Sequence, residues 1–142
     1  MKQNVHFLTL ATADLDAARR FYSALGWQPL ADVPNEIIFY QVAPGLVLGF
    51  FEANKFNRDL ADGSDRSAVS GVTLSHNVES PEEVEAVVQA VVAAGATVLK
   101  KPQAGEFGGI FHAHVQDPNG VIWEIGHNPG WHIAQDGTVV LG

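Results

Sequence analysis

The sequence contains no cysteine, and this absence narrows its chemistry. Disulfide bonds, thiolate nucleophiles and cysteine–metal ligation are all excluded. Histidine, aspartate and glutamate are therefore the strong metal ligands that the chain can offer. The sequence also lacks the G-x-S-x-G, P-loop and H-E-x-x-H motifs. Nothing in it indicates a serine hydrolase, a P-loop nucleotide site or a metalloprotease.

Basic residues are scarce as well. Eight Lys and Arg residues against sixteen Asp and Glu residues give a net charge of −8, which disfavours binding to nucleic acid and to anionic membranes. No run of eighteen apolar residues occurs, so the sequence predicts no transmembrane helix. The N-terminal segment, MKQNVHFLTLATADLD, reaches polar residues too early for a signal peptide. We therefore expect a cytoplasmic protein.

The first half of the chain predicts a strand, a helix and three further strands. Residues 5–11 alternate well enough for a strand. Helical spacing follows in DLDAARRFYSALG, with Asp14 as the N-cap and Gly26 as the stop after the last turn. Three apolar or alternating runs come next, beginning near Trp27, Glu36 and Leu46.

The second half predicts the same order of elements. Residues 71–77 form a strand, and Ser80 with Glu83 makes a capping box for a helix that Gly95 ends. Pro81 occupies the first helical position, where its missing N–H costs nothing. Three strands follow, at about residues 97–101, 111–116 and 121–126, and the turn signal Asn119-Gly120 joins the last two.

The chain is therefore predicted to be an α+β protein that contains two βαβββ modules. We expect residues 1–142 to form a single domain with four parts. These are module one at about 4–52, a polar Gly/Ser/Asp-rich linker at 53–70, module two at about 71–128, and a C-terminal tail at 129–142.

Glu124 stands out because it lies inside the apolar run VIWEI of the last predicted strand. An ionised carboxylate is costly to bury without a partner. A metal ion, a hydrogen-bonding ligand or a cavity facing water could each supply that partner. Alternation along the strand puts Glu124 on the same face as Ile122 and Gly126, opposite Trp123 and Ile125.

Two motifs within this doubled order, DLDAARRFYSALGW and DPNGVIWEI, resemble the vicinal oxygen chelate superfamily. That superfamily holds glyoxalase I, bleomycin-resistance proteins and extradiol dioxygenases, and the resemblance runs from about Val5 to Pro129. It implies two curved mixed sheets that enclose a cavity, each with its other face packed on helices. The segments around residues 75–102 and the tail HNPGW look most like a group of small bacterial proteins without an agreed activity.

Metal-dependent members of this superfamily use a His or Glu from each of four strands, and the ion keeps open positions for two substrate oxygens. Glu124 matches the ligand position of the final strand. The other three positions fall on Phe7, near Gly49, and near Gly71 or Thr73, where no matching donor stands. We therefore expect no intact family metal site and no cofactor.

A rearranged metal site stays open as an alternative. His112 and His114 share one strand face, next to the strand that bears Glu124. Alternate strand residues lie roughly 6.5 to 7 Å apart at Cα, so two imidazoles can converge on one ion. Two histidines and a carboxylate form a known iron or zinc set. The three residues would then serve a metal-dependent lyase, isomerase or dioxygenase-like enzyme. Without a metal, they form a polar ligand-binding wall.

The resemblance favours a bleomycin-resistance-like protein that binds a small organic molecule in the cavity between the modules. Glu124 would pair there with a cationic or hydroxyl group, while no catalytic residue is assigned. The resemblance also implies a homodimer. The expected ligand-binding residues are Phe7, Thr9, Phe39, Phe50, Thr73, Ser75, His112, His114 and Glu124.

Overall fold

The computed structural model describes residues 1–3, 5–60, 63, 65–106 and 108–141. The chain divides into two compact units, Met1–Gly71 with Pro118–Gly120, and Val72–Asp117 with Val121–Gly142. That residues 1–142 form a single domain stays a prediction. Six residues of the expected parts lie outside the described residues: Asn4, Ala61, Asp62, Ser64, Phe107 and Gly142.

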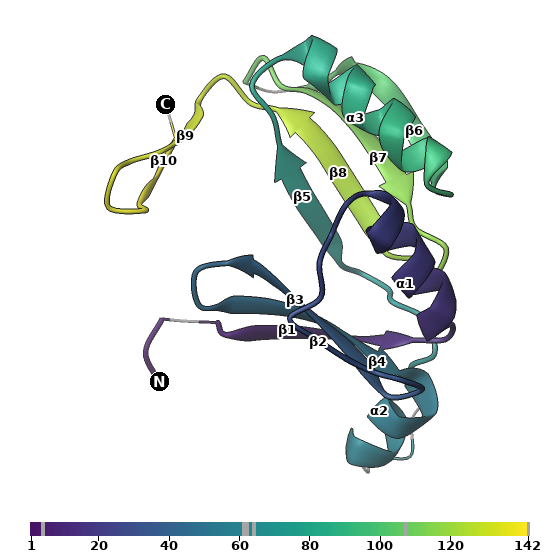
Figure 1. The fold of residues 1–142 in the computed structure, drawn as a ribbon. Helices are drawn as coiled ribbons and strands as arrows, with labels where there is room; N and C mark the ends of the chain where they lie inside the picture. Colours follow the sequence, from purple (N-terminus) through teal and green to yellow (C-terminus); the bar gives the residue numbers. More distant parts are fainter. Residues whose placement is uncertain (4, 61–62, 64, 107, 142) are drawn as a thin grey trace. The chain divides into compact units, whose positions relative to one another are not determined.

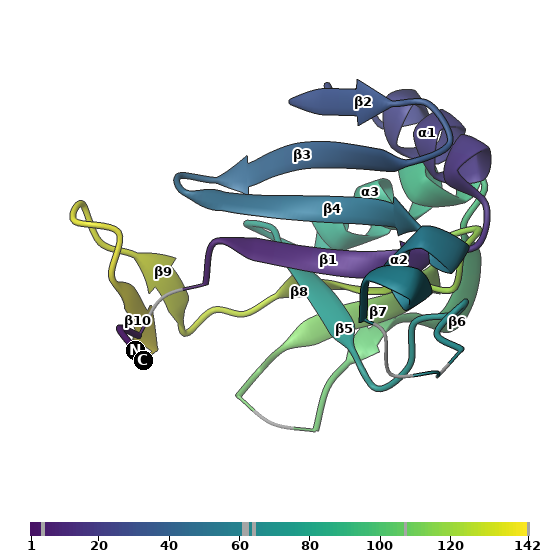
Figure 2. The same ribbon diagram turned by 90° about the horizontal axis from the view of Figure 1, so that it is seen from below.

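The first unit is an open four-stranded sheet with the order β1-β4-β3-β2. Strand β1 runs parallel to β4, and the remaining pairs are antiparallel. Figure 2 shows these four strands side by side, with α2 at the end of β4. The elements are β1 (Phe7–Thr12), α1 (Leu15–Ala24), β2 (Ala31–Val33), β3 (Ile37–Ala43), β4 (Leu46–Glu52) and α2 (Ala53–Leu60).

Helix α1 begins where the sequence predicts. The Asp14 side chain accepts a hydrogen bond from the Ala17 backbone N–H, which satisfies one of the free donors of the first turn. The helix buries Tyr22 completely, and its ring lies 4.8 Å from that of Phe50 and 5.7 Å from that of Tyr40. This aromatic cluster is the core of the first unit.

The second unit repeats the topology of the first, with the sheet order β5-β8-β7-β6 and β5 parallel to β8. The predicted fold class, α+β with two βαβββ modules, is confirmed. Helix α3 lies across one face of this sheet (Figure 1). The elements are β5 (Thr73–Asn77), α3 (Pro81–Ala93), β6 (Thr97–Ala104), β7 (Phe111–Gln116), β8 (Ile122–His127), β9 (Trp131–Ile133) and β10 (Val139–Leu141).

Period-two alternation sorts the side chains of this second sheet. Ala113, Val115 and Ile125 are buried on the face that α3 covers, together with the Val84 and Val88 side chains of the helix. The opposite face is left for polar side chains. The helix itself starts at its predicted capping box, because Ser80 Oγ accepts the Glu83 N–H.

Two expected irregular segments contain regular structure. The expected linker includes α2, whose first turn is satisfied by the Glu52 carboxylate through the N–H groups of Asn54 and Lys55. Glutamate is outside the usual N-cap set, so the sequence pattern did not indicate this start. The expected tail forms the β9–β10 hairpin beyond β8 (Figure 1).

Helix α3, with 13 residues, is longer than α1 and α2. Among the described residues, no helix has the length and apolar character that a membrane crossing needs. A cytoplasmic location stays a prediction.

The core role of Phe50 can be tested by truncation. Phe50→Ala is expected to lower the free energy of unfolding by about 3–5 kcal/mol, because it leaves a cavity beside Tyr22 and Tyr40. Phe7 is 56% exposed, so Phe7→Ala should cost only about 1 kcal/mol. Urea unfolding followed by tryptophan fluorescence measures both. Equal losses would contradict the assignment of Phe50 to the core.

Candidate functional site

The polar face of the second sheet centres on Glu124. In the strand register, Ser75 of β5 lies on one side of Glu124 and His114 of β7 on the other. His112 lies two residues before His114 on β7 and is paired with Gly126 of β8. The predicted shared face of Glu124, His112 and His114 is therefore present in the sheet.

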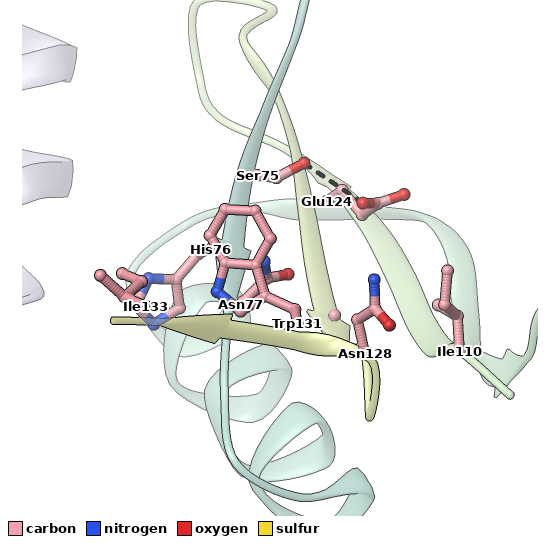
Figure 3. A pocket seen from close by; sticks show the side chains of 9 residues that line it. Ser75, His76, Asn77, Ile110, Glu124, Asn128, Trp131 and Ile133 are labelled. Atoms are coloured by element: carbon pink, nitrogen blue, oxygen red, sulfur yellow. Dashed lines mark hydrogen bonds between the residues drawn. The ribbon is translucent and has the colours of Figure 1, made fainter. Parts of the chain in front are cut away.

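Hydrogen bonds hold the Glu124 carboxylate in place. Ser75 Oγ donates to Oε1 at 3.2 Å (Figure 3), and His112 Nδ1 lies 3.1 Å from Oε2. His114 Nε2 lies 3.4 Å from the same Oε2. The Glu124 side chain keeps 32% of its surface exposed, whereas His112 keeps 15%. The carboxylate is thus oriented by the protein and still open to a ligand.

Lys100 extends this network, and sequence reasoning missed it. Its Nζ lies 2.9 Å from His112 Nε2. An ammonium group has donors and no lone pair, so Lys100 donates and Nε2 accepts. The remaining nitrogen, Nδ1, then carries the proton and donates to Glu124. Lys100 was hard to foresee because β6 shifts register on both sides of it, which breaks the period-two pattern.

The pKa of Glu124 reflects two opposing effects. Burial raises it, but the hydrogen bonds from His112 and Ser75, together with the two nearby imidazoles, outweigh burial and bring the pKa below its ordinary value. The group is therefore ionised at neutral pH. A carboxylate with a lowered pKa is a weak proton acceptor, so it suits charge recognition better than base catalysis.

A pocket of about 420 Å³ adjoins the carboxylate within the second unit (Figure 3). Strand β5 is an edge strand, so the pocket can reach residues from both of its faces. The polar lining consists of Ser75, His76, Asn77, Glu124 and Asn128. The remaining lining residues are Ile110, Gly126, Trp131 and Ile133. Its volume lies within the range of small-molecule sites, which is about 300–1,000 Å³.

The expected ligand-binding residues fall into separate groups. Ser75 and Glu124 line the pocket, the two histidines contact Glu124, and Thr73 lies further along β5, opposite Ile122. In the first unit, the Phe7 and Phe39 rings pack 5.5 Å apart, on the face that also carries Thr9. That the two modules enclose one cavity stays a prediction.

Phe50 has a different role from the one we expected. It lies on the opposite face of the first sheet, fully buried against Tyr22 and Tyr40. Its side chain supplies the core, so we remove it from the candidate ligand contacts. The apolar run LVLGFFE contains two adjacent phenylalanines on opposite faces, and alternation alone does not say which face a helix covers.

Sequence reasoning also missed Asn77, Asn128 and Trp131. Asn77 ends β5, and Asn128 and Trp131 follow β8 in the HNPGW segment. The Asn128 side chain accepts the Gly130 N–H and thereby shapes the turn into β9. The aromatic residue directly after this turn signal is the feature that could have indicated a pocket wall.

The internal repeat shows why the family metal set does not fit. Gly49 lies between Thr9 and Phe39 in the first sheet as Glu124 lies between Ser75 and His114 in the second. A Cβ at Gly49 would come within 3.0 Å of the Phe39 ring, so that ring fills the place where a ligand side chain would stand. Phe7 and Thr73 also offer no family ligand.

A local metal set does fit geometrically. His112, His114 and Glu124 each offer one ligand atom, and these atoms lie within 4.8 Å of one another. Two imidazoles and a carboxylate suit zinc or iron. The Lys100 contact works against such an ion, because a metal on Nδ1 of His112 would need the lone pair that the proton occupies.

Comparison with known proteins gives the same fold. A glyoxalase-related enzyme from Fulvimarina pelagi is 38% identical, over 99% of this chain and 99% of that chain, with a TM-score of 0.87. A glyoxalase/bleomycin resistance protein/dioxygenase family enzyme from Burkholderia phytofirmans PsJN is 24% identical, over 86% and 96%, with a TM-score of 0.72. A lactoylglutathione lyase from Agrobacterium tumefaciens is 21% identical, over 88% and 93%, with a TM-score of 0.68. The last two show the fold alone.

No curated protein matches the chain. The model of the Glyoxalase/Bleomycin resistance protein/Dioxygenase superfamily matches residues 4–125, which cover module one and module two as far as Ile125 in β8. The predicted resemblance is therefore confirmed, and this chain belongs to the glyoxalase/bleomycin resistance protein/dioxygenase superfamily.

Proposed function

We propose that the chain binds a small organic molecule in the pocket beside Glu124, as a bleomycin-resistance-like protein that works without a cofactor. The observation that carries this proposal is an ionised carboxylate, oriented by Ser75 and His112, at the wall of a 420 Å³ pocket. Apolar surface with a few fixed polar groups is what small-molecule sites usually offer.

The protonation of His112 supports the metal-free form. With Lys100 donating to Nε2, the ring presents N–H to Glu124 and has no free lone pair for an ion. Lys100 and Glu124 thus place opposite charges at the two ends of a neutral imidazole. This arrangement fixes the carboxylate without a metal.

The tautomer of His112 provides a test of this hydrogen-bond arrangement. In protein prepared without metal, His112 at pH 8 is expected to carry its proton on Nδ1, because Nε2 accepts from Lys100. Long-range ¹H–¹⁵N spectra of the imidazole rings measure this directly. Exposed His132 on β9 is the control and should show no such fixed preference. A proton on Nε2 of His112 would contradict the Lys100 contact.

A second candidate function has its own supporting observation, the clustering of His112, His114 and Glu124 donor atoms within 4.8 Å. These residues would hold a divalent ion, which supplies Lewis-acid chemistry to a substrate oxygen. The protein would then be a lyase, isomerase or dioxygenase-like enzyme, with Glu124 or a histidine moving a proton. Lys100 would have to turn away from His112 first.

One preparation separates the two candidates. Tag-free protein purified without chelator is expected to contain zinc, nickel, manganese and iron far below one ion per chain. A fragment library screened against the same protein should contain binders that shift the amide signals of Ser75, Asn77 and Trp131. Elemental analysis and NMR make the two measurements. A stoichiometric metal that His114→Ala removes would favour the enzyme. A blank fragment screen would contradict ligand binding.

We also propose that the chain forms a homodimer in the cytoplasm. Each sheet is open, and the edge strands β2 and β6 carry exposed apolar side chains, Val33 and Leu99 among them. Exposed strand edges of this kind favour pairing with another chain. Light scattering after size exclusion should give twice the chain mass of 15.2 kDa. A monomer mass at micromolar concentration would contradict the dimer.

A further inference from the structure

The pocket beside Glu124 has a negative formal charge in its lining and, among the described residues, no Lys or Arg there to balance it. Of its nine lining residues, all within the described part of the chain, Glu124 carries a formal negative charge and none is Lys or Arg. Lys100 is nearby, but it is held against His112 and is not part of the lining. His76 contributes an imidazole to the lining. An anionic ligand would therefore meet a carboxylate without a compensating cation in the lining.

The carboxylate has accepting capacity left. Oε1 accepts one hydrogen bond from Ser75, while Oε2 accepts one from His112 and lies 3.4 Å from His114 Nε2. A carboxylate offers about four lone-pair directions, so further donors can be accommodated. Its 32% exposed surface gives a ligand access to them. A hydrogen bond to an ionised carboxylate is roughly twice as strong as one between neutral groups, and a cationic donor adds Coulombic attraction.

Space is available next to this carboxylate because residue 126 is glycine. A Cβ at that position would lie 3.9 Å from Glu124 Oε1 and 3.4 Å from Asn77 Oδ1. These are ordinary contact distances, so alanine would fit the backbone without strain while reducing the room beside both oxygens. The Glu124 and Asn77 oxygens together form an acceptor-rich end of the pocket.

The other wall is apolar and aromatic. Trp131 and Ile133 of β9 both line the pocket (Figure 3). Ile110 also lines the pocket. An indole attracts organic cations through its electron-rich face and also buries hydrocarbon. The lining thus combines an acceptor-rich end with a surface for an apolar body.

We propose that this pocket is selective for amphiphilic organic ammonium compounds. The ammonium group binds at Glu124 and Asn77, and the hydrocarbon part lies against Trp131 and Ile133. This inference rests on the proposed function, since it names the chemical class of the ligand at that same site. Carboxylates are rejected by the charge of Glu124, and neutral analogues lose the Coulombic attraction between an ammonium group and the carboxylate.

Three probes of nearly equal shape test the selectivity: 3-phenylpropylamine, 3-phenylpropan-1-ol and 3-phenylpropanoate. They are titrated into metal-free protein at pH 7 while backbone amide shifts are followed. The amine is expected to bind at least about tenfold more tightly than the alcohol, because the ammonium charge adds Coulombic attraction to a hydrogen bond that both probes can donate. The carboxylate should produce no pocket shifts. Equal affinity for amine and alcohol would overturn the proposal.

Substitutions of pocket residues test whether the probes bind at this site. Glu124→Gln keeps the size of the side chain and is expected to remove the preference for the amine, while Gly126→Ala and Trp131→Leu should weaken both amine and alcohol. Glu85→Gln is the matched control, because it makes the same charge change at an exposed position of α3 and should leave all affinities unchanged. Amide spectra of each variant verify folding. A preference for the amine that survives in Glu124→Gln would overturn the proposal.

Failure of this inference differs from failure of the proposed function. If alcohol and amine bind alike and Gly126→Ala weakens both, the pocket binds ligands but does not select cations. If none of the three probes binds while the fragment library contains other pocket binders, the ammonium class is likewise overturned and ligand binding stands. A blank library overturns both.

Discussion

Each sheet of this chain has one face covered by a helix, and that constraint determines where the side chains of the Glu124 cluster can lie. Under α3, alternate positions of β7 and β8 are apolar and buried, so the intervening positions are the ones free to carry His112, His114 and Glu124. A shift of one residue in the register would bury the carboxylate under the helix. The buried valines of α3 therefore stabilise the site as well as the fold.

The cost of a partly buried carboxylate is offset locally. Ser75 and His112 donate to Glu124, and Lys100 donates to the far nitrogen of His112, so the negative charge and the positive charge are joined through a neutral ring. The same chain of hydrogen bonds leaves a strand-face carboxylate ionised and partly exposed. A metal ion is one way to stabilise such a group, and a lysine behind a histidine is another.

The two modules show how one topology can carry different chemistry. Corresponding positions in the two sheets hold Gly49 and Glu124, each paired with a neighbour on the parallel strand and another on the antiparallel strand. In the first module an aromatic ring from Phe39 occupies the space that a longer side chain would need. In the second module the space is open and polar. Because of this difference, the polar cluster around Glu124 lies in the second unit.

The order of strands and helices could be predicted from the sequence, because capping residues, glycine stops and apolar spacing are local signals. Asp14 and Ser80 mark the helix starts they were expected to mark, and Glu124 shares a face with the two histidines as alternation requires.

The local sequence pattern could not identify which of two adjacent phenylalanines enters the core, since that depends on the side from which α1 packs. It could not bring Lys100 to His112, because register shifts in β6 interrupt the alternation there. Nor could it place Trp131 in the same pocket as Glu124, since that pocket wall arises only when the chain after β8 forms the β9–β10 hairpin. The sequence by itself determined the elements and their faces through short-range sterics and burial, and the tertiary structure decided which distant side chains share a pocket.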